Sequence, residues 1–183
     1  RFRIATFHAE LSRDGPGLLL RDIRKGEDAQ ALAAAAVIAT AQPDVLLLTG
    51  FDWDLDLTAL TAFSDLLAQR GAVYPHRFAL RPNTGLMTDH DLDGDGRHRG
   101  PGDAQGWGRF SGEGGMAVLS RQPIDTAGIT DHSALLWKDL PGALIGGAGL
   151  SPDAQAVQRL SSTGHWQVPV VLPSGKVLTF LAW

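Results

Sequence analysis

The chain has 183 residues, of which 44% are hydrophobic and 20% are charged, and it contains no cysteine. This length suits one domain with a single core, and the absent cysteines exclude a disulfide scaffold and thiolate zinc or iron–sulfur sites. A formal net charge of −4 leaves no basic excess for a broad nucleic-acid surface, although a metal-assisted contact with one phosphate stays open. We therefore expect one loop-rich globular domain over residues 1–183.

The first part of the chain predicts alternating strands and helices. Residues 1–8 alternate in polarity as a strand does, and residues 44–48 form a short apolar run that is typical of a strand buried on both faces. Between them, the alanine-rich residues 27–42 predict a helix that Pro43 ends. A second helix is predicted over residues 57–70. This order predicts helices packed on a sheet.

The second part of the chain predicts more loop and fewer elements. Residues 81–115 show little periodicity and many Gly, Asp and Arg residues, so we expect a long loop. Loops of that length inside a compact domain are usually functional or disordered. Residues 116–120 predict a strand, and residues 144–154 predict a loop. Residues 165–172 and 176–183 predict a β-hairpin.

The two ends of the chain also carry information. The chain begins at Arg1 rather than a methionine, and it has no apolar stretch long enough to span a membrane. It stops at Trp183 within an apolar run. A natural domain rarely ends on an unprotected hydrophobic strand, because the unpaired edge invites aggregation. We therefore expect a chain truncated at its C-terminus, with an exposed apolar edge that the missing part would cover.

Residues 91–97 read D-L-D-G-D-G-R and form the clearest local motif. Carboxylates at every second position around a glycine turn can converge on a hard cation, as in the first half of a helix–loop–helix calcium site. The predicted ligands are the side chains of Asp91, Asp93 and Asp95, with the backbone carbonyl of Arg97 as a fourth. The twelfth position is Gly102 rather than a bidentate glutamate, so an acidic, solvated loop remains the alternative.

Polar side chains follow two of the predicted strands. His8 and Glu10 lie two residues apart after the first strand, and Asp52 and Asp54 do so after the second, so each pair shares a face. Adjacent strand ends that present a histidine and carboxylates can form a metal or acid–base site. The alternative is that Asp54 and Asp56 cap the helix that follows.

A third candidate lies near the end of the chain. His165 opens a predicted strand beside the hydroxyl groups of residues 161–163, in reach of a role as a phosphate or proton partner. The alternative is a packed, hydrogen-bonded structural histidine beside Trp166. The glycine-rich residues 112–115 are a weak phosphate cradle, because no helix follows them.

Four segments, in this order and spacing, resemble the endonuclease/exonuclease/phosphatase superfamily. They are T-F-H-A-E at 6–10, P-D-V-L-L-L-T-G-F-D-W-D at 43–54, G-G-M-A-V-L-S-R-Q-P-I at 114–124 and L-S-S-T-G-H-W-Q-V-P-V at 160–170. The chain is most similar to the bacterial secreted or periplasmic members that carry P-N-T-G and D-L-D-G-D-G-R insertions, here at 82–85 and 91–97. The resemblance spans essentially the whole chain.

This resemblance implies an α/β (α+β) fold of the deoxyribonuclease-I-like type. Such a fold is a four-layer αββα sandwich, with two packed mixed sheets and helices outside, and this chain would be its N-terminal half. Members cleave phosphodiesters or phosphomonoesters with a divalent ion, so the implied cofactor is magnesium or manganese at the active site. The calcium predicted at residues 91–97 comes from the motif itself. The resemblance and the missing initiator methionine together imply a periplasmic or secreted protein.

The active-site motifs of the family are only partly present. The usual T-F-N-x-E motif places a metal-site carboxylate at Glu10, but His8 stands where the family has asparagine. The usual L-N-E-F-D motif supplies the principal metal ligand, and this chain has Gly50 in that place. Asp52, two residues on, is our expected substitute. The resemblance thus implies catalytic roles for His8, Glu10 and His165, substrate contacts for Asn83 and Ser162, and metal ligation by Glu10 and Asp52.

Two functions follow from this incomplete match. The later family motifs H-P-T-P-P, G-D-x-N and S-D-H are absent, so the chain as given should not hydrolyse phosphoesters unaided. The first interpretation is the N-terminal half of a metal-dependent phosphoesterase, whose partners are a phosphate-ester substrate and its own C-terminal half. The second is a catalytically degenerate, calcium-stabilised binding protein with the same fold. Gly50 favours the second interpretation, and the apolar end at Trp183 favours the first.

Overall fold

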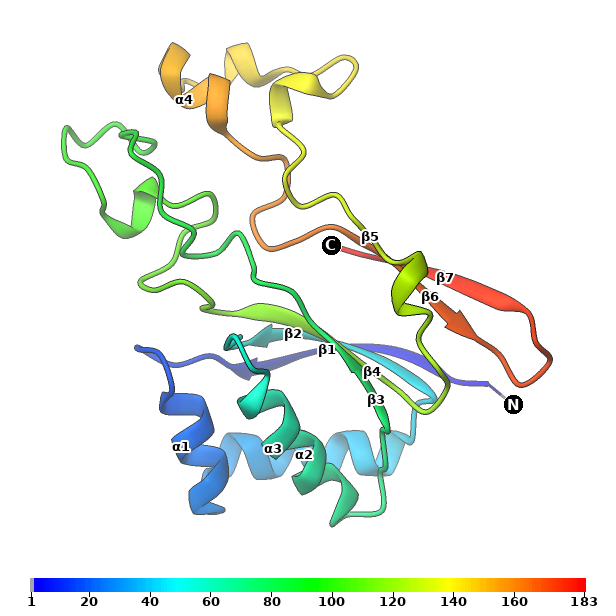
Figure 1. Cartoon of the computed structure of the whole chain (residues 1–183). Helices are drawn as coiled ribbons and strands as arrows, with labels where there is room; N and C mark the ends of the chain where they lie inside the picture. Colours follow the sequence, from blue (N-terminus) through cyan, green and yellow to red (C-terminus); the bar gives the residue numbers. More distant parts are fainter. Residues whose placement is uncertain (1) are drawn as a thin grey trace.

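A computed structural model describes residues 2–183 of the chain. Two β-sheets face each other, and helices cover the outer face of one of them (Figure 1). The strands are β1 (Ile4–Leu11), β2 (Val45–Phe51), β3 (His76–Phe78), β4 (Gly115–Ser120), β5 (Thr130–Asp131), β6 (Trp166–Val171) and β7 (Val177–Ala182). The helices are α1 (Leu18–Lys25), α2 (Ala29–Ala41), α3 (Thr58–Ala68) and α4 (Pro152–Val157). None of the helices in residues 2–183 is long and apolar enough to cross a membrane.

The first sheet is mixed and has the order β1-β2-β4-β3. Strands β1 and β2 are parallel, because α1 and α2 form the crossover between them, whereas β4 runs antiparallel to both of its neighbours. The pairing of β1 with β2 brings His8 opposite Thr49. The polar residues at the carboxyl ends of the two strands therefore lie at the same end of the sheet.

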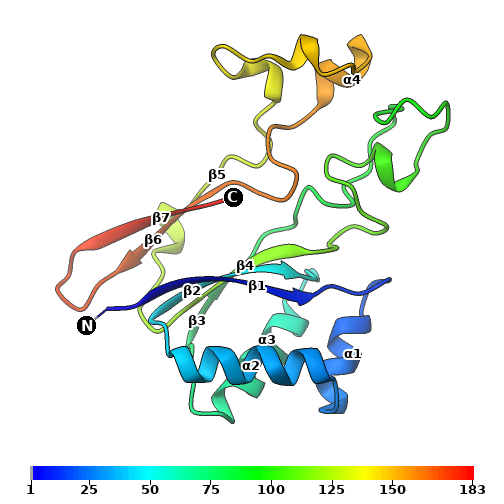
Figure 2. The same ribbon diagram turned by 180° about the vertical axis from the view of Figure 1, so that it is seen from behind.

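Helices α1, α2 and α3 pack against one face of this sheet (Figure 2). The core there joins Leu46 and Leu48 of β2 to Phe63 of α3, all of them fully buried. Helix α2 contributes small side chains, which let its backbone approach the sheet closely, and it begins where the Asp28 side chain accepts a hydrogen bond from Ala31 N at 2.7 Å. The predicted helix over residues 27–42 is therefore confirmed, with Asp28 as its N-cap.

The second sheet is antiparallel, with the order β5-β6-β7, and contains the predicted hairpin. Its inner face packs on the first sheet, where Val168 of β6 and Val118 of β4 belong to the same buried cluster. Trp166 anchors this core, and its ring meets Phe78 edge-on at 5.2 Å between centroids. The facing of two sheets with helices outside is the predicted sandwich, of which the described residues form a helical layer and both sheets (Figure 1).

One predicted loop is wrong. Residues 144–154 contain a short 3-10 helix, Ile145–Gly147, and the start of α4. The helix α4 forms because Ser151 Oγ accepts a hydrogen bond from Ala154 N at 3.2 Å and Pro152 follows directly as the first helical residue. This helix lies at the end of the molecule, away from both sheets (Figure 1).

The strands β1 and β7 are edge strands of the two sheets and lie on the same side of the molecule (Figure 2). Between them is an apolar groove of about 290 Å³, whose walls include Ile4, Leu47 and Phe180. The side chain of Ile4 is 56% exposed and that of Leu181 is 57% exposed. The expected exposed apolar edge of the last strand is thus present.

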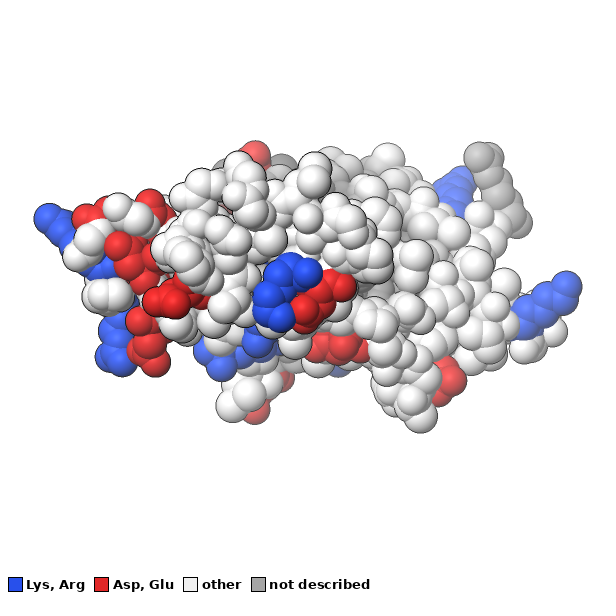
Figure 3. Space-filling view, turned by 90° about the horizontal axis from the view of Figure 1, so that it is seen from above, with Lys and Arg blue, Asp and Glu red and all other residues white. Residues whose placement is uncertain are grey.

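The charged side chains are mixed on the face seen in Figure 3. Lys and Arg residues lie beside Asp and Glu residues there, and no continuous basic patch covers that face. Ion pairs between the two kinds of charge also occur in the structure, and Arg109 forms one with Glu113 at 3.0 Å and one with Asp14.

Candidate functional site at the ends of two strands

Both strands that lead into the predicted site are irregular at the same place. The pairing of β1 with β2 shifts between His8 and Leu11, and the pairing of β2 with β4 shifts between Thr49 and Phe51. At these bulges Glu10 has φ of 50° and Gly50 has φ of 65°, both left-handed. A glutamate in this conformation is strained, and such strain is concentrated at functional sites. The bulges turn the strand ends away from regular pairing.

The side chain of His8 lies directly over Gly50. Its Nδ1 atom is 3.0 Å from the Thr49 hydroxyl oxygen. A Cβ atom built on Gly50 would lie 2.6 Å from His8 Cε1, closer than real Cβ contacts allow. The imidazole therefore occupies the space into which a side chain at position 50 would project.

Asp52 is buried and holds two loops together. Its Oδ2 atom accepts a hydrogen bond from Arg13 N at 2.8 Å, and its Oδ1 atom accepts one from Gly114 N at 2.9 Å. Burial raises the pKa of Asp52 above its ordinary value of 3.8, although the N–H donors of Gly114 and Arg13 and the Ser12 hydroxyl act in the opposite direction. Both carboxylate oxygens are thus engaged in structural hydrogen bonds.

Asp54 caps helix α3, as the alternative interpretation of this residue predicts. Its Oδ1 atom accepts hydrogen bonds from Thr58 N at 2.7 Å and from the Thr58 hydroxyl at 2.8 Å. Its Oδ2 atom accepts one from Ala59 N at 2.8 Å. These contacts satisfy two of the free N–H groups of the first helical turn.

The resemblance implies a magnesium or manganese site at the strand ends, but the residues present there do not fit such an ion. Within residues 2–183, the one group of three or more histidine or carboxylate ligand atoms that lie within 4.8 Å of one another is that of Asp91, Asp93 and Asp95. Glu10 and Asp52 therefore belong to no such group, and Gly50 offers no side chain.

His165 belongs to a cluster of rings beside the second sheet. Its ring centroid lies 5.5 Å from that of His132 and 6.1 Å from that of Trp183. The backbone N–H of His165 donates to the Ser133 hydroxyl at 2.9 Å. An open depression of about 480 Å³ lies beside this cluster, lined by residues 160–165 and Trp183. Ser162 is exposed there, so the structure brings Ser162 and His165 to one surface.

Asn83 is buried, with 1% of its surface exposed. Its Nδ2 atom donates to the backbone carbonyls of Ser133 at 2.8 Å and Ser161 at 2.6 Å. Its Oδ1 atom accepts a hydrogen bond from Arg159 Nη1 at 2.6 Å. The expected substrate-binding Asn83 therefore lies beneath the surface, where it ties together loops that are distant in the sequence.

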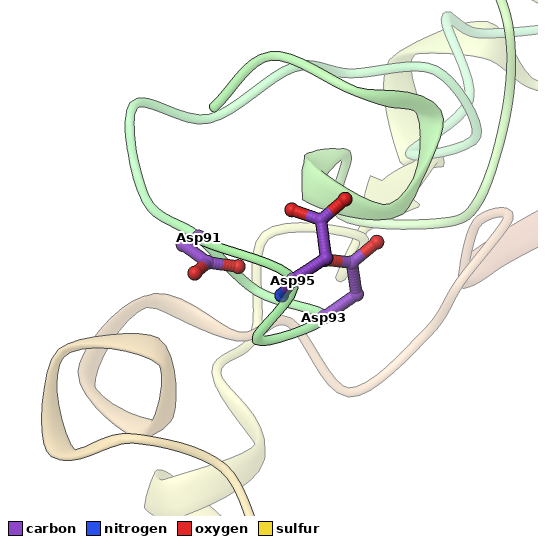
Figure 4. A group of neighbouring side chains, drawn as sticks. All are labelled: Asp91, Asp93 and Asp95. Atoms are coloured by element: carbon purple, nitrogen blue, oxygen red, sulfur yellow. The ribbon is translucent and has the colours of Figure 1, made fainter. Parts of the chain in front are cut away.

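The acidic loop brings Asp91, Asp93 and Asp95 together around one tight turn (Figure 4). The two carboxylate oxygens of Asp91 accept hydrogen bonds from Gly94 N at 2.7 Å and Gly96 N at 2.9 Å. Burial raises the pKa of Asp91, but these N–H donors outweigh it, so the pKa lies below its ordinary value. A carboxylate cluster of this kind can hold a hard cation.

Asp103, which the sequence motif does not contain, stabilises this loop through buried hydrogen bonds. It is 1% exposed, and its carboxylate accepts hydrogen bonds from Leu92 N at 2.9 Å and Gly100 N at 2.8 Å. His132, whose ring is tilted against that of His165, is also outside every motif. No sequence signal points to His132, because the two-residue strand β5 beside it is defined by its pairing with β6.

Comparisons with known proteins agree with the fold. The model of the Endonuclease/Exonuclease/phosphatase family matches residues 21–177. A search of curated proteins gave no match. The structure is similar to the crystal structure of an endonuclease/exonuclease/phosphatase from Beutenbergia cavernae, with a TM-score of 0.50 and 20% sequence identity. That match covers 99% of this chain and 36% of the other, so this chain spans about a third of that protein's length and the likeness shows the fold. From the family match and this shared fold, the chain belongs to the endonuclease/exonuclease/phosphatase family.

Proposed function

We propose that the chain is part of a metal-dependent phosphoesterase, a phosphodiesterase, nuclease or phosphatase, and that it does not hydrolyse phosphoesters unaided. The family match over residues 21–177 carries this proposal. Further support comes from the strained Glu10, which lies two residues after His8 at the end of β1, since strain of this kind is typical of active sites.

In this proposal the chain supplies one wall of the active site. His8, Glu10 and His165 provide imidazole and carboxylate groups that can orient water or carry a proton, and Ser162 provides a hydroxyl to a phosphate oxygen. Because the family's later motifs are absent from the sequence, the remaining catalytic groups and the ligands of the ion would come from further polypeptide of the same protein. That polypeptide is also our proposed partner for the free edges of β1 and β7.

The test is hydrolysis of bis-p-nitrophenyl phosphate with magnesium or manganese. The protein encoded by the whole reading frame should turn over this substrate, and the 183-residue chain should not. The His165→Ala variant of the longer protein should lose activity, whereas replacement of the exposed Val37 on α2 should not affect it. Absence of turnover with either metal in the longer protein would contradict the phosphoesterase function.

A second candidate function is a degenerate, calcium-stabilised binding protein with the same fold. The replacement of a metal-ligand position by Gly50 favours it, because glycine offers no side-chain oxygen. Calcium would bind the acidic loop at Asp91, Asp93 and Asp95 and would order this part of the chain.

We further propose that the protein is periplasmic or secreted, which fractionation of its source cells would test.

A further inference from the structure

Position 50 has a backbone that favours glycine. It lies inside β2 with φ of 65°, at the point where the pairing with β4 shifts by one residue. Other residues adopt this left-handed conformation at a cost, although Glu10 and Leu57 do so elsewhere in the chain, at 50° and 53°. The backbone therefore disfavours a side chain at position 50 without forbidding one.

The stronger obstacle is His8. A Cβ atom at position 50 would lie 2.6 Å from His8 Cε1, 3.0 Å from Nε2 and 3.1 Å from Nδ1, so it would meet the ring along one whole side. The ring is kept there by the contact of Nδ1 with the Thr49 hydroxyl at 3.0 Å. The imidazole of residue 8 and any side chain of residue 50 therefore exclude each other from one volume.

The neighbouring carboxylates do not compensate for the missing one. Both oxygens of Asp52 accept backbone hydrogen bonds, from Arg13 N and Gly114 N, and the residue is 6% exposed. Turning Asp52 toward a metal ion would leave these two N–H groups without their partner. With Asp54 engaged at the start of α3, Glu10 is then the remaining carboxylate of the strand ends, and a magnesium ion held by one carboxylate depends on phosphate or water for its other oxygen ligands.

We propose that His8 and Gly50 form a coupled pair that replaces an oxygen ligand by an imidazole, so that the strand ends of this chain do not themselves bind a hard divalent ion such as Mg²⁺. Magnesium prefers carboxylate and carbonyl oxygens in near-octahedral geometry, which one imidazole and one free carboxylate do not provide. Any effect of magnesium on this chain then arises at the acidic loop. The inference rests on the proposed function and adds the reason that this chain's own strand ends do not hold the ion, namely the His8 ring in the space over Gly50.

The test is a magnesium titration of the 183-residue chain, followed by the backbone amide signals in NMR spectra. The Asp93→Asn variant serves as the background, because it weakens the acidic loop and leaves the strand ends unchanged. We expect no saturable shift at residues 8–10 or 49–52 in this background. The triple variant Asp93→Asn/His8→Asn/Gly50→Glu removes the ring and supplies a carboxylate, so it should gain saturable shifts at those residues.

Two results would overturn the proposal. One is a saturable magnesium-dependent shift at the strand ends with His8 and Gly50 in place, because the native pair would then bind the ion. The other is a folded triple variant that gains no shift, because the pair would then not be what prevents binding. Neither result depends on hydrolysis, so a failure of the proposed phosphoesterase function remains distinguishable from a failure of this inference.

Discussion

At the scale of single residues, two aspartates with similar positions in the sequence do different work. Asp54 caps α3 through N–H groups four and five residues ahead, whereas Asp52 joins Arg13 and Gly114, which lie on separate loops. Sequence spacing identifies both as polar groups at a strand end. It does not show whether their oxygens are free, because the donors to Asp52 come from residues far away in the chain.

The first prediction concerns Asp52. Its pKa in the folded protein is raised above 3.8, so the stability contributed by its protonated form is complete below pH 3.8 and is lost as the pH rises through the folded pKa. In the Asp52→Asn variant this loss disappears. The free energy of unfolding, measured in urea between about pH 4 and 7, should therefore fall less, or rise more, with increasing pH than in the native protein.

The matched control is Asp56→Asn, because Asp56 lies nearby on the exposed surface. This variant removes one carboxylate but leaves the contacts to Arg13 and Gly114 unchanged. Parallel curves of stability against pH for Asp52→Asn and the native protein would contradict the prediction. In Asp52→Asn one of the two acceptor oxygens becomes an NH2 group, so one of the two backbone N–H groups loses its acceptor. This variant should therefore be less stable than the native protein at neutral pH by about 1–3 kcal/mol.

At the scale of elements, strong periodicity and clear end signals were sufficient for prediction. Helix α2, strand β2 and the β6–β7 hairpin lie where the sequence predicts them. Helix α1 was not predicted, because it has eight residues and no side-chain hydrogen bond at its N-cap, Gly17. Strand β3 has three residues and is defined by its pairing with β4 rather than by a local pattern. Short elements depend on tertiary contacts, which periodicity does not encode.

The second prediction concerns the acidic loop at this scale. Calcium should raise the melting temperature, because it neutralises the carboxylates of Asp91, Asp93 and Asp95 and binds the folded state. At 100 times the dissociation constant the gain is about 2.7 kcal/mol, which corresponds to roughly 5–11 °C for a chain of this size. The Asp93→Ala variant should lose the increase, as measured by differential scanning calorimetry.

Asp89→Ala is the control for this measurement. Asp89 is an exposed carboxylate just before the loop and pairs with Arg99 at 3.0 Å, outside the group of three. Its replacement should leave the calcium-dependent increase largely unchanged. An identical melting curve of the native chain with and without calcium would count against a calcium site, and the acidic solvated loop would then be the correct interpretation.

At the scale of the whole molecule, the edge strands β1 and β7 of the two sheets border one apolar groove. Strands β1 and β7 each pair on one side only, and the groove between them exposes apolar side chains such as Ile4 and Leu181. Unpaired strand edges with apolar neighbours are templates for further strands. This geometry makes the side of the molecule that carries β1 and β7 the expected contact surface of the chain.

The third prediction follows from these edges. The isolated 183-residue chain should dimerise or aggregate, because apolar side chains at these edges are exposed. The Leu181→Glu variant places a charge on the free edge of the hairpin and should shift the chain toward monomer in sedimentation velocity experiments at increasing concentration. Val37→Glu, on the exposed face of α2, introduces the same charge away from the groove and should have no such effect. A native chain that sediments as a monomer at high concentration would contradict the prediction.

The sequence by itself determined the family and the mixed α/β sandwich, because these depend on local patterns and on the order of motifs. The tertiary structure alone decided what the site residues do. It placed the His8 ring over Gly50, engaged both oxygens of Asp52 and buried Asn83 beneath the surface. The physical reason is that the space and hydrogen-bond partners of these side chains come from segments distant in the sequence, which meet only when the sheets and loops pack.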